Sequence, residues 1–92
     1  MRSKVVWREE AEKNLEEIGR SDWLTAEKIR EKVEKHLASH PTQNGKPLSG
    51  KWQGFWRYRC LDIYRIIYEV KQNELLILVV KVGHRSKVYK KV

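Results

Sequence analysis

Three stretches of the chain, residues 53–60, 64–71 and 74–82, are rich in Val, Ile, Tyr, Trp and Phe, and short turn-like segments separate them. Side chains that alternate with a period of two are typical of β-strands, so these stretches predict a meander of three antiparallel strands. Residues 75–80, LLILVV, are apolar at consecutive positions. This pattern predicts a strand that is covered on both faces and is the central member of the sheet.

The first part of the chain has a different period. Residues 3–7 are a short strand candidate, and apolar residues at helical spacing then predict a first helix to about Gly19: Trp7, Ala11, Leu15 and Ile18. Ser21 or Asp22 can cap a second helix, which the His40-Pro41 pair should end. Its apolar stripe repeats every four residues: Ile29, Val33 and Leu37. The short connection predicts an antiparallel helical hairpin.

The predicted order is strand, helix, helix, strand, strand, strand, with residues 40–51 as a loop. It indicates an α+β fold in which the N-terminal strand and the helical hairpin pack on one face of an antiparallel sheet. The other face should be open. A chain of 92 residues fits one domain, residues 1–92.

The net charge of +8 lies entirely in the second half of the chain. Residues 1–39 contain nine Lys or Arg and nine Asp or Glu, whereas residues 40–92 contain eleven and three. Such one-sided positive charge is expected of a protein that binds nucleic acid or an acidic protein, although it is also compatible with a surface that lysines merely keep soluble.

Other compositional features narrow the class of protein. The N-terminus has no apolar run of signal-peptide length, and no eighteen apolar residues are consecutive, so we expect a cytoplasmic protein without a membrane partner. The single cysteine, Cys60, cannot form an internal disulfide or a zinc cluster. We therefore expect no metal, no cofactor and no small-molecule ligand.

Three arginines lie within the strand-like segment FWRYRCLDIYRIIYEV, residues 55–70. Alternation places Arg57 and Arg59 on one face of their strand, and Arg65 joins them only if the hairpin loop has three residues, 61–63. A two-residue loop would bury Arg65 beneath the helices, where an unpaired charge costs several kcal/mol. We therefore predict the three-residue loop. In the alternative interpretation of the face, Asp62 and Glu69 neutralise two of the arginines in surface ion pairs.

The tail VGHRSKVYKKV, residues 82–92, adds basic and proton-transferring groups at the end of the last strand: His84, Arg85, Lys87, Tyr89, Lys90 and Lys91. Arginines, an imidazole and a phenol beside a basic face form a plausible site for phosphodiester chemistry. His84 has an alternative role as a residue that caps the strand end.

The runs LSGKWQGFWRYRCLDIYRIIYEV and LLILVVKVGHRSKVY resemble the RelE toxins of the RelE/ParE superfamily over about residues 48–89. Members of that group carry a similar R-x-R, then D-Y-R followed by two hydrophobic residues and Tyr, then V-G-H-R-x-x-V-Y. The resemblance implies a type II toxin that is held inactive by a cognate antitoxin. It also implies a metal-independent, ribosome-dependent endoribonuclease that cleaves mRNA in the A site, by attack of the 2′-hydroxyl on the adjacent phosphate, and so inhibits translation.

The same resemblance implies the roles of individual residues. Arg65 and Arg85 match phosphate-binding arginines of the family site and Tyr89 its C-terminal tyrosine, while Arg57 and Arg59 match two basic strand residues. Some relatives have lysines at the last two positions, and an arginine cannot readily give up its proton. His84 is the best local candidate for proton transfer, Tyr89 can be acid, base or stacking platform, and Glu69 is a weaker base candidate. Further cations expected to bind RNA or phosphate are Lys81, Lys87 and Lys90.

Two other functions stay open. A ParE-like inhibitor of DNA gyrase would share the fold but generally lacks the ribonuclease residues, and the VGHRSKVY ending favours RelE. A basic module without catalytic activity, which only binds RNA or an antitoxin, is the third hypothesis.

Overall fold

The computed structural model describes residues 3–89. The chain begins with strand β1 (Lys4–Trp7), followed by helices α1 (Glu9–Ser21) and α2 (Trp23–Glu31), and α2 continues as a π-helical segment, Lys32–Leu37. Strands β2 (Lys46–Pro47), β3 (Trp56–Cys60), β4 (Tyr64–Lys71) and β5 (Leu76–His84) follow. Short 3-10 turns lie at Gly50–Trp52 and Gln72–Glu74.

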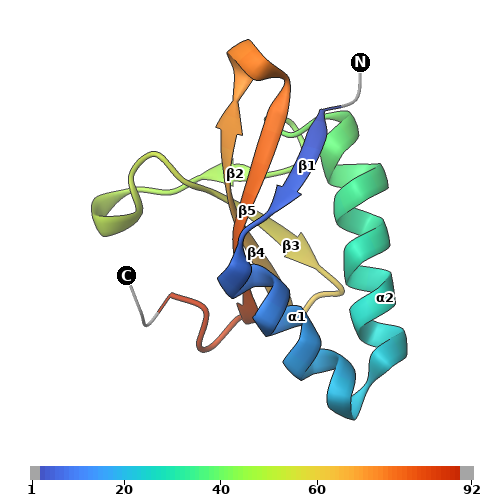
Figure 1. The fold of residues 1–92 in the computed structure, drawn as a ribbon. Coiled ribbons are helices and arrows are strands. Elements are labelled where there is room, and N and C mark those ends of the chain that lie inside the picture. The colour runs from blue at the N-terminus through green and yellow to red at the C-terminus, as the bar shows by residue number, and fades with distance from the viewer. Residues whose placement is uncertain (1–2, 90–92) are drawn as a thin grey trace.

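These strands form one sheet in the order β1-β5-β4-β3-β2, and α1 and α2 pack side by side on one of its faces (Figure 1). The predicted α+β fold and its order of elements are therefore confirmed. The sheet is mixed rather than antiparallel throughout as predicted, because β1 pairs with β5 in parallel and the other pairs are antiparallel. The N-terminal strand is also an edge strand of the sheet, contrary to the prediction that it packs on one face together with the helices. Residues 40–51, predicted as loop, contain the two-residue strand β2 and part of a 3-10 turn.

The prediction that residues 75–80 form the central strand is wrong. Strand β4 has two neighbours on each side, whereas β5 lies between β1 and β4. The consecutive apolar residues of β5 also do not mean that the strand is equally buried on both faces. Ile77 and Val79 are fully buried, while Leu76, Leu78 and Val80 are half-buried, so the helix-covered face alone is tightly packed.

The core lies between the helical pair and the sheet. Its fully buried large side chains include Ile29, Val33, Leu37, Ile66, Tyr68, Ile77 and Val79. Tyr68 donates a hydrogen bond to the Pro41 carbonyl at 2.6 Å, and Tyr58 Oη lies 2.8 Å from His36 Nδ1. These bonds satisfy the hydroxyls of two buried tyrosines.

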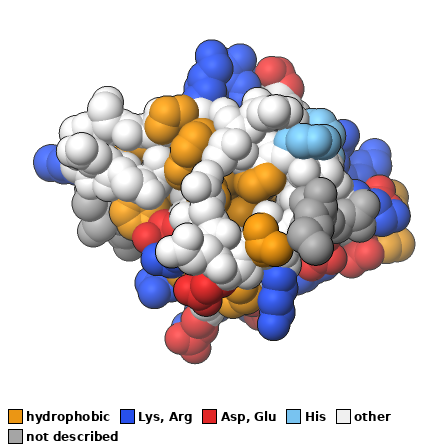
Figure 2. Space-filling view, turned by 90° about the horizontal axis from the view of Figure 1, so that it is seen from above, with side chains coloured by type: hydrophobic (Ala, Val, Ile, Leu, Met, Phe, Trp, Pro, Cys, Tyr) orange, Lys and Arg blue, Asp and Glu red, His pale blue; other side chains and the backbone are white. Residues whose placement is uncertain are grey.

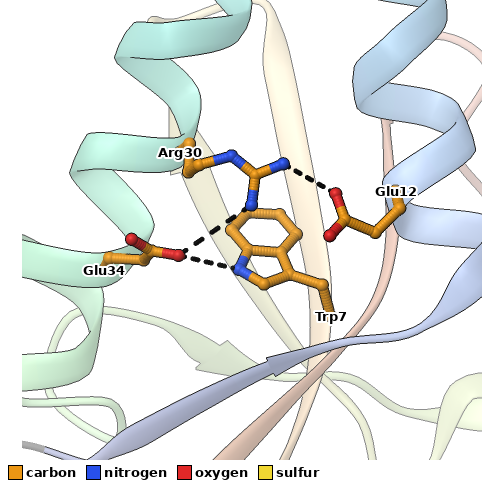
Figure 3. Close-up of polar contacts among 4 residues, drawn as sticks. All are labelled: Trp7, Glu12, Arg30 and Glu34. Atoms are coloured by element: carbon orange, nitrogen blue, oxygen red, sulfur yellow. Dashed lines mark hydrogen bonds and ion pairs between the residues drawn. The ribbon is translucent and has the colours of Figure 1, made fainter.

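Helix caps and a polar cluster hold the helical hairpin in place. Asp22, one of the two predicted caps, accepts hydrogen bonds from the Thr25 amide and hydroxyl. Trp7, the last residue of the predicted strand and the first of the predicted helical stripe, ends β1. It donates its indole N–H to Glu34 at 3.0 Å, while Arg30 lies 4.8 Å above the Trp7 ring (Figure 3). Arg30 also pairs with Glu12 at 2.6 Å, so the cluster joins β1, α1 and the π-helical segment after α2.

The end of the molecule at the β4–β5 connection carries exposed apolar side chains with charged residues around the rim (Figure 2). A shallow depression there is lined by residues that include Pro41, Val70 and Leu75, and Leu75 is 51% exposed in a left-handed backbone conformation. Within residues 3–89, no helix has the length and apolar character needed to cross a lipid bilayer.

Candidate functional site

The β3–β4 hairpin has the predicted three-residue loop, Leu61–Asp62–Ile63. Cys60 pairs with Tyr64 on either side of the loop, and Arg59 pairs directly with Arg65. Leu61 and Asp62 adopt positive φ angles of 51° and 65°, which close the turn. The three hairpin arginines therefore share the sheet face opposite the helices. We call this surface the arginine face and define it by Arg57, Arg59, Arg65 and Lys81.

Strand register extends the arginine face across four strands. One row of directly paired residues runs Lys46, Arg57, Ile67 and Lys81 from β2 to β5, and the next runs Arg59, Arg65 and Gly83. A register shift near Ile67 and Tyr68 brings Lys81, rather than Val80, opposite Ile67. The bulge thus adds Lys81 to the cations of the face.

The hairpin arginines have no acidic partner among residues 3–89. Glu69 instead pairs with Lys71 at 3.6 Å, and Asp62 lies 4.0 Å from Arg85. Arg65 donates to the carbonyls of Asp62 and Tyr64, at 2.6 and 2.9 Å. These bonds fix the guanidinium without neutralising it, so the alternative in which Asp62 and Glu69 neutralise two of the hairpin arginines is wrong.

The pKa of Arg65 reflects burial and the other arginines around it. Partial burial and the nearby charges of Arg59 and Arg57 lower the pKa of Arg65, and Arg85 acts in the same direction. The Tyr89 side chain has the opposite effect on this pKa. Because an arginine keeps its charge at neutral pH even when its pKa falls, the cluster is a site of concentrated positive charge. Such a site favours an anion that can bind several guanidinium groups.

The segment after β5 crosses the arginine face because Gly83 has no side chain. A Cβ at Gly83 would lie 3.2 Å from Val88 Cβ and Cγ2, and Val88 is 2% exposed. The Arg85 amide donates to the Ile63 carbonyl at 2.7 Å, which ties the same segment to the hairpin loop. Together these contacts place Arg85 and Tyr89 close to Arg65, as their effects on its pKa require.

Two predicted residues lie on the other side of the sheet edge. His84 pairs with Tyr64, one position beyond Gly83, and its ring packs edge-on against the Tyr64 ring at 6.4 Å. Both His84 and Lys87 line a cleft of about 630 Å³ against α1, together with Glu10 and Glu17. Lys81 lines the same cleft, so the cleft reaches the border of the arginine face. Alternation along β5 places His84 on the face opposite Arg65 and Gly83.

His84 has a clear local role in the turn that follows β5. The Ser86 amide donates to His84 Nδ1 at 3.1 Å, and the Ser86 hydroxyl lies 2.8 Å from the same nitrogen. The His84 carbonyl accepts from the amides of Lys87 and Val88. These contacts stabilise the turn that places Val88 against Gly83. They agree with the alternative role of His84, in which it caps the strand end.

The structure thus gathers Arg57, Arg59, Arg65, Arg85, Tyr89 and Lys81. His84 lies on the opposite face of β5, and Lys87 lines the cleft that Lys81 also borders. Lys90, predicted to bind RNA, lies outside the described residues. Among residues 3–89, no three His, Cys, Asp or Glu side chains gather into a group that could hold a metal ion.

Sequence reasoning missed Trp52, which touches the arginine face from the loop before β3. Its ring packs against Tyr89 and Phe55, with centroids 6.3 and 5.5 Å apart, and Lys81 Nζ lies 5.9 Å from its centre. The sequence did contain one indication of a role for Trp52. It is a large aromatic residue in a polar loop between Gly50 and Gly54, where such a side chain is expected to pack against the protein or to contact a ligand. The partner residues were not readable from the sequence, because they are far away along the chain.

A five-stranded mixed sheet with a helical hairpin on one face matches the fold of the RelE-like toxins. A family model described as the ParE toxin of the type II toxin–antitoxin system parDE matches residues 5–89. The chain therefore belongs to the ParE toxin family, within the RelE/ParE superfamily. No curated protein matches the sequence significantly.

Solved structures agree on the fold. The toxin–antitoxin complex RelBE2 from Mycobacterium tuberculosis contains a chain that is 21% identical, with a TM-score of 0.84 over 92% of this chain and 100% of that one. A YoeB/ParE toxin from Agrobacterium tumefaciens is 24% identical, with a TM-score of 0.73 and coverage of 89% and 98%. A free double mutant of Escherichia coli RelE is 20% identical, with a TM-score of 0.68 and coverage of 100% and 99%. The resemblance to this superfamily is confirmed.

Proposed function

We propose that this toxin is a ribosome-dependent endoribonuclease that cleaves mRNA in the A site by attack of a 2′-hydroxyl on the adjacent phosphate. One observation carries the proposal. Arg59 and Arg65 are paired directly across β3 and β4, with Arg57 beside them and no acidic ion-pair partner among residues 3–89. Like charges held opposite each other destabilise a sheet, so this arrangement is best explained by an anionic ligand.

The arginines supply the electrostatic part of the reaction. During attack on phosphorus, negative charge increases on the non-bridging oxygens, and guanidinium groups fixed beforehand stabilise that charge without reorganising. Arg65 is held by two backbone carbonyls, so its position does not depend on the substrate. Arg85 reaches the same region from the segment after β5, as its effect on the Arg65 pKa indicates.

Proton transfer needs groups that can gain and lose a proton. Arg57 and Arg59 do this poorly, and His84 points away from the face. Tyr89 and Lys81 carry transferable protons close to Arg65 and Trp52, whereas Lys46 lies at the outer edge of the face, on β2 beyond Arg57. We therefore assign proton transfer to this pair, with His84 as the residue that positions their segment through the turn at Ser86.

Two comparisons bear on the partners. RelBE2 and the YoeB-YefM complex from Staphylococcus aureus are toxin–antitoxin complexes, and on that basis we infer a protein antitoxin for this chain. The ribosome and its mRNA are the inferred target. An inhibitor of DNA gyrase is the second candidate, favoured by the ParE description of the matching family.

A paired assay separates the two functions. Purified toxin is incubated with programmed ribosomes while message ends are mapped, and the same preparation is tested for inhibition of gyrase supercoiling. Cuts confined to the A-site codon, with a 2′,3′-cyclic phosphate at the new end, are expected. Intact message with inhibited supercoiling would favour the gyrase target, and no effect in either assay would favour a binding module.

Salt dependence provides an independent measurement of phosphate contacts. Binding of single-stranded RNA should weaken with salt by a slope of about −0.7 for each phosphate neutralised. Arg59→Ala should reduce the magnitude of that slope by about one contact. Arg20→Ala is a matched control, because Arg20 is an exposed arginine at the end of α1 and its loss changes the net charge equally.

A further inference from the structure

Trp52 occupies a fixed position beside the arginine face. It ends the 3-10 turn Gly50–Trp52, and the chain turns at Gly50 and Gly54, whose φ angles of 63° and 96° suit glycine. The Trp52 amide donates to the Ser49 carbonyl at 3.2 Å, and the Phe55 amide donates to the Trp52 carbonyl at 3.0 Å. The loop is therefore built by its own backbone bonds and presents the indole from a defined place.

Three neighbours locate the indole relative to the proposed phosphate site. Its ring meets the Tyr89 ring edge-on, with 6.3 Å between centroids and 75° between planes. Phe55 meets the same indole at 5.5 Å and 82°. Lys81 Nζ, from the row that contains Arg57, is 5.9 Å from the indole centre. Trp52 thus borders the surface on which the cations converge.

Part of the indole remains available to a ligand. Trp52 is half-buried, and its N–H forms no hydrogen bond within residues 3–89. This donor is not buried, so water can satisfy it in the free protein and a ligand can replace that water. An indole with an open donor, next to a phenol and several cations, offers both stacking and hydrogen bonding to a planar polar group.

We propose that Trp52 and Tyr89 form an aromatic shelf that stacks a nucleobase of the RNA whose phosphate the arginines bind. This inference rests on the proposed ribonuclease function and adds a substrate-positioning residue to it. Proteins that bind single-stranded RNA combine basic groups along the backbone with aromatic rings under the bases. The perpendicular rings allow a base to lie on one of them with its edge against the other.

The alternative role for Trp52 is packing alone. In that role the side chain would hold the loop and Tyr89 in place, and its loss would weaken the binding of any phosphate ligand equally, with or without a base. A base-stacking role instead requires that the loss depend on the presence of the base. Ligands that differ only in the base therefore separate the two roles.

The experiment compares a fluorescein-labelled single-stranded RNA hexamer with an abasic hexamer that has the same number of phosphates. Trp52→Leu should weaken binding of the base-containing hexamer about tenfold and leave the abasic hexamer within about twofold of the unchanged protein. Trp52→Phe, which keeps an aromatic ring, should lose no more than about threefold. Trp23→Leu is the matched control, because Trp23 is 65% exposed at the start of α2.

A spectroscopic readout accompanies the affinities. A stacked base quenches tryptophan emission, so the base-containing hexamer should quench the unchanged protein and Trp23→Leu but quench Trp52→Phe much less. Equal losses on both hexamers, or no loss on either, would overturn the shelf. If the unchanged protein cleaves mRNA while Trp52→Leu retains full activity, only the shelf fails. If the unchanged protein neither binds RNA nor cleaves it, the proposed function fails as well.

Discussion

Arg59 and Arg65 lie directly opposite each other across β3 and β4, and neither forms an ion pair with an acidic side chain of residues 3–89. The two guanidinium groups therefore repel each other in the unliganded protein, and after partial burial the charge of Arg59 is the next cause that lowers the pKa of Arg65. A bound phosphate changes this repulsion into a favourable interaction with both groups.

Removing one member of this pair should stabilise the fold while it weakens function. Arg59→Ala is expected to raise the free energy of unfolding by some tenths of a kcal/mol, since like charges opposite each other on a sheet cost about that much. Chemical denaturation in low salt, with and without sulfate, measures the effect. Sulfate should stabilise the unchanged protein more than Arg59→Ala. A variant that is less stable than the unchanged protein in low salt would contradict the repulsion.

Arg65→Ala and Arg85→Ala should each abolish growth arrest in cells without unfolding the protein. Both residues border the arginine face, and fixed donors around developing charge are typically worth about 3–4 kcal/mol in the transition state. Toxicity on induction and mRNA cleavage on ribosomes measure the loss, with circular dichroism as the test of folding. Arg20→Ala should remain toxic. Full toxicity of both site variants would show that the site lies elsewhere.

Gly83→Ala should push the segment after β5 away from the sheet by a few tenths of an ångström. The added methyl group would lie 3.2 Å from Val88 side-chain atoms, so Val88 and the adjacent Tyr89 must shift. Overpacking of this kind costs about 1–3 kcal/mol, and activity should fall by more than stability alone explains. Val88→Ala in the same background shortens the side chain that the new methyl group would meet, so it should restore part of the activity. Unchanged activity in Gly83→Ala would mean that the segment tolerates the shift.

Stability should fall at alkaline pH, and the cause lies in the core. Burial raises the pKa of Cys60 from 9.0 to about 11 and that of Tyr58 from 10.0 to about 12, and Tyr68 shifts in the same direction. These groups lose their protons first in the unfolded chain, so the stability they confer is complete below about pH 9 and is lost as pH rises toward 12. Thermal unfolding from pH 8 to 11.5 measures this loss of stability. Cys60→Ala should remove the part of the loss that begins at the lowest pH, because the Cys60 thiol has the lowest unfolded pKa of the three groups, 9.0.

A His84→Gln variant tests the positioning role of that residue. Glutamine can accept the Ser86 amide in place of Nδ1 but cannot transfer protons at neutral pH, so activity between pH 5 and 8 should keep the shape of its profile. His84→Ala should lower activity at every pH because the turn loses its acceptor. If the glutamine variant instead loses an ionisation that the pH profile of the unchanged protein shows, His84 takes part in proton transfer.

Local patterns in the sequence predicted much of this architecture. The helical spacing of Ile29, Val33 and Leu37 and the period of two in the later strands identified the elements, and the burial cost of Arg65 selected the correct loop. The parallel pairing of β1 with β5 was not predictable in the same way, because its partners are far apart in the chain. The two residues of β2 are too few to produce a periodic signal.

The candidate site was predicted less completely, for a geometric reason. Residues 83–89 leave the strand in a turn, so alternation no longer determines where their side chains lie. His84 and Tyr89 belong to one short motif, yet His84 lines the cleft against α1 while Tyr89 packs against Trp52 beside the arginine face. Trp52 joins the site through contacts with Tyr89 and Lys81, and no spacing rule connects those three positions.

The parallel pairing of β1 with β5 also has a consequence for the folding pathway. The three-strand meander closes short loops, whereas Lys4 must find Leu76 across almost the whole chain. Closing the longer loop costs more entropy and depends on a β5 that is already paired, so docking of β1 should come late. We expect truncation of Val5 mainly to accelerate unfolding and truncation of Ile66 mainly to slow folding. The strands that carry the arginine face would then pair before the sheet is complete.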